Sequence, residues 1–472
     1  MSTGVRADLR YTVRMNENND PSTLITVETI EADASAPTPE IVRRGIFGSF
    51  WHRDFTLFWL GSLASNIGTW MQNYALGIVV FAFRDSSFDL GLVNFLSGIP
   101  VLFLGLPAGV IADRVDRRKL LLGIQVVLLL QATALGVLYN TGVLNSEHAT
   151  TSLAWVASLG LIAGMVIAFQ GPSFQSMVPD LVPRSLLMNA IALNSAQFQG
   201  ARMLGPLIAA ALVLAGAGMG EVFYVNAASF LFVIGALSLM RRDRSGALAA
   251  KRERSDPREG TWATLTAGVR YAMRHRSVGV LLIGQALFTM CGMPYMMLVP
   301  ALVTTSLGAA TVSPEYARWT AYIMTANGLG ALFGALAVAG LPTSIRRERI
   351  IPLGIVAFSL LAAAFALSHW FWLSLLLSPL AGATFIAVNS LTNTSIQASA
   401  PGPIRGRVMA LFVMAFLGVM PISALAFGTL AEFATPSIAV ATGAAILFVW
   451  SILLMARPTW LDTHPSAPAS ES

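Results

Sequence analysis

Long uninterrupted apolar segments constrain the fold of this chain more than any other feature. A helix needs about 20 residues, each rising about 1.5 Å, to cross the hydrocarbon of a bilayer. Segments of that order lie near 55–82, 89–112, 119–140, 152–177, 186–215 and 221–240, and again near 277–306, 317–341, 350–369, 371–397, 407–431 and 436–456. The sequence therefore predicts an all-α membrane protein with twelve transmembrane helices. The division of 350–397 into two spans depends on a very short turn at 368–370.

The composition agrees with lipid as the main solvent. Of 472 residues, 55% are hydrophobic and 11% are charged, whereas a soluble domain carries about 25% charged residues. The single cysteine, Cys291, excludes an intrachain disulfide, and the five histidines never fall at ligand spacing. There is no G-x-x-x-x-G-K-[ST] phosphate-binding motif. We therefore expect no enzymatic activity, no metal, no cofactor and no ATPase within the chain.

Arginine and lysine residues alternate between the loops. Every second loop is basic, from the one after the second span to the chain beyond the twelfth, while the others are nearly bare, with Arg318 as the later exception. This alternation is the positive-inside pattern of an inner-membrane protein with both termini in the cytoplasm. It also accounts for the formal net charge of +6. The expected partners of the basic runs are membrane lipids, and no nucleic acid.

One long polar run, 241–276, divides six spans from six. A Q-x-x-x-P pattern closes the fourth span at Gln175 and the tenth at Gln397, which indicates a repeat. Parallel six-span repeats are a recurring transporter plan, with substrate bound between the halves. The predicted parts are a cytoplasmic tail with an interfacial segment (1–50), an N-terminal six-helix bundle (51–240), a cytoplasmic linker (241–276), a C-terminal six-helix bundle (277–457) and a cytoplasmic tail (458–472).

Arg202 is the most informative single residue. It lies near the middle of an uncharged stretch, where a charge costs about 3 kcal/mol or more unless it faces water or a partner. At about 100° per residue, Ser195 and Gln199 share its helical face. We interpret this face as part of a substrate pathway that meets an anionic or acceptor-rich molecule. The alternative is a clamp in which Arg202 binds backbone carbonyls of a neighbouring helix.

Two further spans carry uncharged polar stripes. Helical spacing places the members of each stripe on one face, and such faces must contact protein or water. The alternative to a polar pathway is hydrogen bonding between helices. The first stripe comprises Ser62, Ser65, Asn66, Thr69, Gln72 and Asn73, and the second Asn389, Asn393 and Gln397.

The loop after the second span carries a charged motif. It is similar to the G-x-x-x-D-R-x-G-R-R signature of the major facilitator superfamily, with Asp116 in place of a glycine. The resemblance implies the twelve-helix fold of that superfamily and a conformational latch that breaks as a carrier changes state. The alternative is that the charges only set topology. The matching residues are Gly109, Asp113, Arg114, Arg117 and Arg118.

The fifth span resembles a glycine- and proline-rich motif of the superfamily's exporters. Gly205 and Pro206 match, in a stretch that opens at Gly200, while Ala209 and Ala210 replace a glycine pair. Proline removes a backbone hydrogen bond and kinks a helix, and glycine permits close helix contact. The resemblance favours export, and simple packing is the alternative.

The first half resembles the enterobactin-exporter-like, or transmembrane secretion effector, branch, through 50–55, 66–70, the charged loop and the fifth-span motif. This implies alternating-access export of a siderophore-like or amphiphilic drug-like small molecule, driven by protons, by a monomer. No Asp or Glu lies deep in a span, so the sequence does not reveal the proton relay. The alternatives are an importer or lipid flippase of the same fold, or a membrane receptor or scaffold that transports nothing.

Overall fold

The computed structural model describes residues 47–240, 261–311, 313–341 and 347–461. Across these residues the secondary structure is helical, with no strand. The chain divides after Gly48 into two compact units, and the helices described below lie in the second, Ser49–Ser472.

The N-terminal half contains six long helices, and polar caps mark where two of them start. Ser86 accepts a hydrogen bond of 3.2 Å from the backbone N–H of Asp89 at the start of the second helix. Asp116 accepts from the N–H groups of Arg118 and Lys119 at 3.0 and 3.3 Å, so it serves as an N-cap where the superfamily signature has glycine. The six are α1 (Arg53–Arg84), α2 (Ser87–Arg114), α3 (Arg117–Asn140), α4 (Ala149–Leu181), α5 (Leu187–Leu214) and α6 (Met219–Leu239).

The C-terminal half contains the other six spans, and two of them are irregular. The predicted span 277–306 is broken into α9 (Arg276–Gly292), α10 (Pro294–Met297) and α11 (Val299–Thr305), because Pro294 and Pro300 lack the N–H group that would continue the helix. The predicted span 407–431 contains a π-helical turn, η4 (Met414–Gly418), between α15 (Gly402–Val413) and α16 (Val419–Phe433). The remaining spans are α12 (Pro314–Ala339), α13 (Arg347–Ala366), α14 (Phe371–Ser399) and α17 (Pro436–Ala456).

Eleven helices of the described residues are long and apolar enough to cross a membrane. The predicted span that this count leaves out is the first one, α1. Its 32 residues exceed the needed length, but its polar stripe lowers its mean hydropathy. The predicted division of 350–397 is confirmed, since α13 and α14 are separate helices. The prediction of an all-α, twelve-helix fold is thus confirmed.

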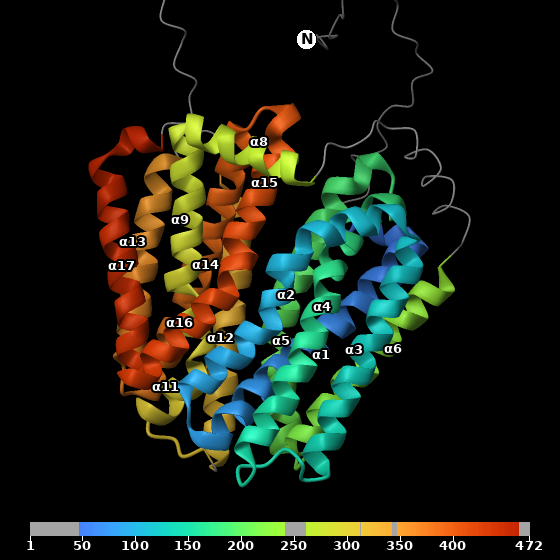
Figure 1. The fold of residues 1–472 in the computed structure, drawn as a ribbon, viewed down its shortest axis with the longest axis vertical. Coiled ribbons are helices and arrows are strands. Elements are labelled where there is room, and N and C mark those ends of the chain that lie inside the picture. Colours follow the sequence, from blue (N-terminus) through green and yellow to red (C-terminus); the bar gives the residue numbers. More distant parts are fainter. Residues whose placement is uncertain (1–46, 241–260, 312, 342–346, 462–472) are drawn as a thin grey trace, which may run out of the picture. The chain divides into compact units, whose positions relative to one another are not determined.

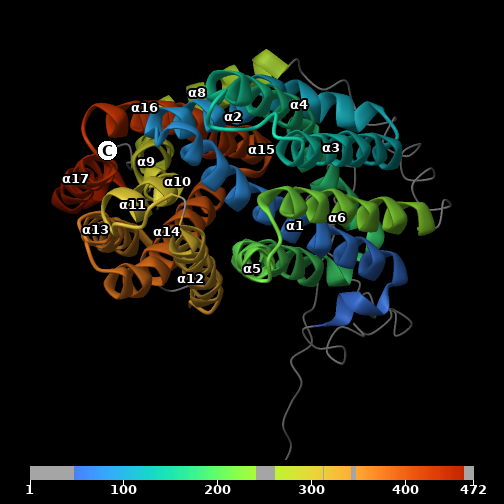
Figure 2. The same cartoon turned by 90° about the horizontal axis from the view of Figure 1, so that it is seen from below.

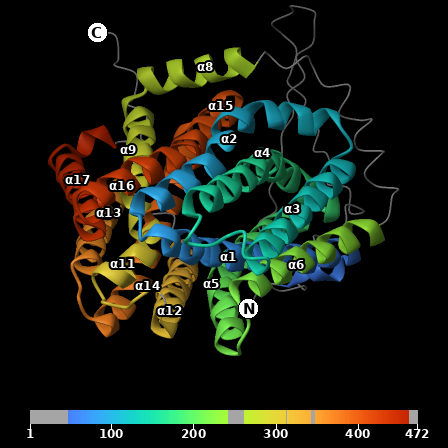
Figure 3. The same cartoon turned by 60° about the horizontal axis from the view of Figure 1, so that its bottom comes forward.

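The helix α8 (Thr261–Arg274) lies within the segment that the sequence predicts as a polar linker. It contacts α15 and α9 and lies across their ends (Figures 1 and 3). The residues 241–260 of the same segment lie outside the described part of the chain.

The two halves meet along two pairs of helices. α5 packs against α12, and α2 packs against α16; Figure 2 shows both pairs side by side. Glycine permits the close approach, since a methyl group at Gly328 of α12 would lie 2.7 Å from the Cα of Met203 in α5. On the α2 side, a methyl group at Gly428 would lie 2.8 Å from the Cα of Gly91.

Within the C-terminal half, α12 and α14 interlock through glycines on both helices. A methyl group at Gly330 would lie 2.6 Å from the Cα of Pro379, and one at Gly334 would lie 2.8 Å from the Cα of Ala383. Such small residues let helix backbones pack closely in a membrane. The seam places Asn327, one turn before Gly330, against α14.

Candidate functional site

Arg202 lies where the two halves meet. It is on α5, is 8% exposed, and donates a hydrogen bond of 2.8 Å from Nη2 to Oδ1 of Asn327 on α12. Its guanidinium carbon lies 5.6 Å from the ring centroid of Trp70 on α1. Arg202 therefore joins helices of both halves in the middle of the predicted membrane region.

Asn327 extends this contact into the C-terminal half. Its side-chain amide donates to the hydroxyl of Tyr295 on α10 and to the carbonyl oxygen of Ser378 on α14 at 3.2 Å. Ser378 in turn donates to the carbonyl oxygen of Ile323 at 2.8 Å. Asn327 is fully buried. Trp70, Arg202, Asn327 and Tyr295 thus form one connected group, which we call the Arg202 cluster.

The contacts of Arg202 stabilise its buried charge but leave one of its N–H groups without a partner. A desolvated cation–π contact is worth about 2 kcal/mol, and a hydrogen bond to a charged group about 1.5–3 kcal/mol. Together these offset a burial cost of about 3 kcal/mol on insertion scales. However, Nε of Arg202 is buried without a hydrogen-bond partner, which costs a further amount of about 1–3 kcal/mol. The guanidinium is held in place and retains capacity for another acceptor.

The other predicted members of the Arg202 face differ in burial. Gln199 is buried, while Ser195 is exposed and donates to the carbonyl oxygen of Ile191 in its own helix at 3.0 Å. The structure therefore places Gln199 and Arg202 at buried positions and Ser195 at an exposed one.

The polar stripe of α1 divides between two environments. Gln72 donates to Oε1 of Gln131 on α3 at 3.3 Å and accepts from Asn226 on α6 at 2.8 Å. This buried network joins three helices inside the N-terminal half. In contrast, Asn73 is exposed.

The remaining predicted pathway residues are half-buried. Thr69 donates to the carbonyl oxygen of Ser65 in its own helix at 2.9 Å, and Asn66 is only partly covered. On α14, Asn393 accepts from Gln397 at 2.7 Å, while Nδ2 of Asn389 is buried without a partner. A role of these residues in a substrate pathway stays a prediction.

The predicted latch is described in part. Arg117 forms an ion pair of 3.2 Å with Asp180 at the end of α4. Arg118 donates to the carbonyl oxygens of Ser238 and Met240 at 3.0 and 3.2 Å, which are the last acceptors of α6. The side-chain surroundings of Gly109, Asp113 and Arg114 lie outside the described part of the chain, and the latch stays a prediction.

The fifth-span motif lies within α5, which continues through Pro206 as one helix. Gly205 faces α1, where a methyl group would lie 2.9 Å from N of Met71 and 3.0 Å from O of Ile67. Gly200 has open space around it. Close packing thus accounts for Gly205, while no contact explains Gly200.

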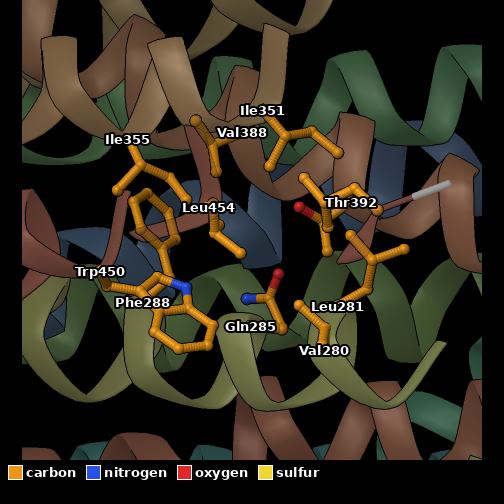
Figure 4. A pocket seen from close by; sticks show the side chains of 12 residues that line it. Val280, Leu281, Gln285, Phe288, Ile351, Ile355, Val388, Thr392, Trp450 and Leu454 are labelled. Atoms are coloured by element: carbon orange, nitrogen blue, oxygen red, sulfur yellow. The ribbon is translucent and has the colours of Figure 1, made fainter. Parts of the chain in front are cut away.

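A narrow cavity lies inside the C-terminal half, between α9, α13, α14 and α17 (Figure 4). Oε1 of Gln285 and Nε1 of Trp450 are buried there without hydrogen-bond partners. Figure 4 shows both groups facing the same apolar space. An acceptor and a donor in so narrow a space suit a molecule of about the size of water rather than an organic substrate.

Asn327 and Tyr295 are the site residues that sequence reasoning missed in this role. Tyr295 stands out in the sequence only as part of a methionine-rich segment around Pro294. The signal that could have found Asn327 is a single amide beside Gly328 and Gly330 in a mostly apolar span, because a buried amide beside small residues needs a partner on a neighbouring helix.

Comparisons with known proteins agree with this architecture. Residues 45–468 match the family described as transmembrane secretion effector. The chain is 26% identical over 427 residues to the "Enterobactin exporter EntS" of Escherichia coli O1:K1, covering 89% of this chain and 96% of that protein. The same values hold for the exporter of that name from Shigella boydii serotype 18.

Solved transporters share the fold at low sequence identity. A mutant form of the nucleoside transporter NupG superposes with a TM-score of 0.71 at 12% identity, covering 85% of this chain and 99% of that one. The D-xylose-proton symporter gives a TM-score of 0.63 at 13% identity, covering 87% and 99%. The chain belongs to the transmembrane secretion effector family of the major facilitator superfamily, and it is a multi-pass transporter of the inner membrane.

Proposed function

We propose that this protein exports a small organic molecule, siderophore-like or amphiphilic and drug-like, across the inner membrane by alternating access. The observation that carries this proposal is the buried, incompletely satisfied guanidinium of Arg202 at the contact between the halves. An anionic or acceptor-rich group of the substrate supplies the missing partner. The similarity to exporters of enterobactin supports the outward direction.

In this mechanism, Arg202 holds an anionic or acceptor-rich substrate group while the halves rearrange. The substrate competes with Asn327 for the guanidinium, and the ring of Trp70 offers a face for an aromatic part of the molecule. Gln199, Asn66, Thr69, Asn73, Ser195, Asn389 and Asn393 are the proposed polar positions along the pathway. Gln72, which the sequence assigned to the same set, is proposed to hold α1 beside the pathway through Gln131 and Asn226.

The structure corresponds, in this proposal, to a state closed at the end opposite the arginine-rich loops. Tyr74 on α1 donates to the carbonyl oxygen of Ala317 on α12 at 2.6 Å. Glu432 on α16 accepts from the hydroxyl of Ser86 at 3.0 Å and from N–H of Phe88 at 3.1 Å. With the arginine-rich loops and both termini in the cytoplasm, these contacts close the periplasmic side. The latch residues Gly109, Asp113, Arg114, Arg117 and Arg118 act at the other end, and Gly200, Gly205 and Pro206 shape α5.

Protons are the proposed coupling ion and the monomer is the proposed working unit. Asp113 and Glu432 are the first carboxylates to test, since the described acidic residues lie near helix ends. Collapse of the pH gradient in inverted vesicles should abolish substrate accumulation if coupling is correct.

Comparing the secreted metabolites of cells with and without the gene tests the function. Loss of one compound outside, with its accumulation inside, identifies substrate and direction together. Cells that carry Arg202→Gln should resemble cells without the gene. Cells that carry Arg318→Gln should resemble the wild type, because this half-buried arginine is paired with Glu315 in its own helix. Flux into right-side-out vesicles would indicate an importer, lipid scrambling without metabolite change a flippase, and no flux a receptor or scaffold.

A further inference from the structure

One face of α8 is fixed on the C-terminal half by two contacts. A methyl group at Gly268 would lie 3.0 Å from the carbonyl oxygen of Arg407 in α15. Tyr271 donates from its hydroxyl to the carbonyl oxygen of Ser399, the last residue of α14, at 3.2 Å. Gly268 is buried and Tyr271 is half-buried. The helix thus rests on the C-terminal end of α14 and on α15.

The opposite face of α8 carries two parallel rows of exposed side chains. Val269 and Met273, which are 42% and 75% exposed, lie four residues apart and form an apolar row. Arg270 and Arg274 are also exposed and form a basic row, displaced from the apolar one by about 100°. No ion pair joins either arginine to a carboxylate among the residues that the structure describes.

A second basic cluster lies beside α8, where α9 begins and α17 ends. The guanidinium carbons of Arg276 and Arg457 lie 4.8 and 5.1 Å from the ring centroid of Trp460. Both arginines are exposed, and Trp460 is half-buried. Two cations held on one aromatic ring repel each other, and an anion placed between them removes that repulsion.

We propose that the exposed face of α8, together with Arg276, Arg457 and Trp460, binds the headgroups of anionic phospholipids. The apolar row enters the acyl boundary and the basic row meets the phosphates, as in helices that lie in the membrane plane. Tryptophan favours the same depth. A nucleic acid would leave Val269 and Met273 in water, so a lipid surface matches both rows. These lipids belong to the cytoplasmic leaflet if the topology in the proposed function is correct.

Bound anionic lipid also bears on the transport cycle. α8 belongs to the segment that connects the two halves. It contacts α15, the part of its span that lies next to the cytoplasm in the proposed topology. A helix fixed to the headgroups restrains the cytoplasmic end of α14 and α15. Anionic lipid is therefore expected to shift the balance between the two conformations of the carrier.

Depth-dependent quenching in nanodiscs tests the binding surface. The full-length protein carries Cys291→Ser and Met273→Cys, labelled with bimane, in nanodiscs of phosphatidylcholine with or without phosphatidylglycerol. Brominated phosphatidylglycerol should quench the label at least threefold more than brominated phosphatidylcholine. The paired substitution Arg270→Gln with Arg274→Gln should remove this difference, and Arg276→Gln with Arg457→Gln should reduce it. The control Arg318→Gln should leave it intact.

Equal quenching by both lipids, or an unchanged preference in the paired variants, would overturn the proposal. Absence of quenching together with protection of Met273→Cys from thiol reagents in native membranes would point to a protein partner and overturn it as well. Thermal unfolding of each variant identifies loss of folding. A fluorescent label on Arg349→Cys, in the first turn of α13, gives a second measure of lipid contact if a substitution disturbs α8 alone. Because the readout is lipid contact and not flux, failure of this proposal can be distinguished from failure of the proposed transport function.

Discussion

The hydroxyl of Tyr74 in α1 donates a hydrogen bond of 2.6 Å to the carbonyl oxygen of Ala317 at the start of α12. It is a direct bond between the two halves, at the end where Glu432 also contacts the start of α2. A net hydrogen bond is worth about 0.5–1.5 kcal/mol, which suits a contact that must break in every cycle.

Tyr74→Phe is expected to favour opening at this end by about two- to tenfold, since only the hydrogen bond is removed. Spin labels on Phe88→Cys and Phe433→Cys in the Cys291→Ser background report the distance between α2 and α16. The control is Tyr139→Phe, because Tyr139 packs on Phe223 within the N-terminal half. An unchanged distance distribution in Tyr74→Phe would show that this bond does not hold the end closed.

Asn327→Asp should impair transport. The new carboxylate pairs with Arg202 at the distance of the present hydrogen bond and supplies the negative charge that we assign to the substrate. It cannot donate to the carbonyl oxygen of Ser378 as the amide does, so the new ion pair and the lost hydrogen bond act in opposite directions on the unfolding temperature. The transport rate should fall at least tenfold. Normal transport would mean that Arg202 is a structural clamp.

Gln72→Leu should destabilise the N-terminal half without changing substrate affinity. The substitution leaves Gln131 and Asn226 without their shared partner, at a cost of about 1–3 kcal/mol in all. Thermal unfolding and KM separate stability from binding when measured beside Asn73→Leu, an exposed position of the proposed pathway that should raise KM at unchanged stability. A raised KM at unchanged stability would return Gln72 to the substrate pathway.

Gly205→Ala and Gly200→Ala should differ although they lie in one motif. The first forces apart α5 and α1, so expression and unfolding temperature should fall. The second meets no neighbouring atom and should raise helix stability by about 1 kcal/mol. If Gly200→Ala instead abolishes transport in a stable protein, flexibility of α5 is needed in the cycle.

Sequence reasoning predicted the twelve spans well because length and hydropathy directly reflect the bilayer. It missed the breaks at Pro294 and Pro300, since a broken span has the same mean hydropathy as a continuous one. It identified Arg202 because a charge in an apolar span is costly. It did not identify Asn327 as the partner, because the pairing of α5 with α12 depends on how the halves assemble.

The α1 stripe shows the same limit in another form. Periodicity placed Gln72 and Asn73 on one polar face, but adjacent residues lie about 100° apart. One therefore points into the N-terminal half and the other is exposed. A helical period gives the width of a face, and only the neighbouring helices decide which side of it is covered.

The close glycine contacts between α12 and α14 make these two helices move as one rigid unit in the proposed cycle. Backbones in such close contact leave little room for sliding or bending between them. A displacement of Asn327 therefore moves α12 and α14 together, and the hydrogen bond from Arg202 is where the N-terminal half is coupled to that unit.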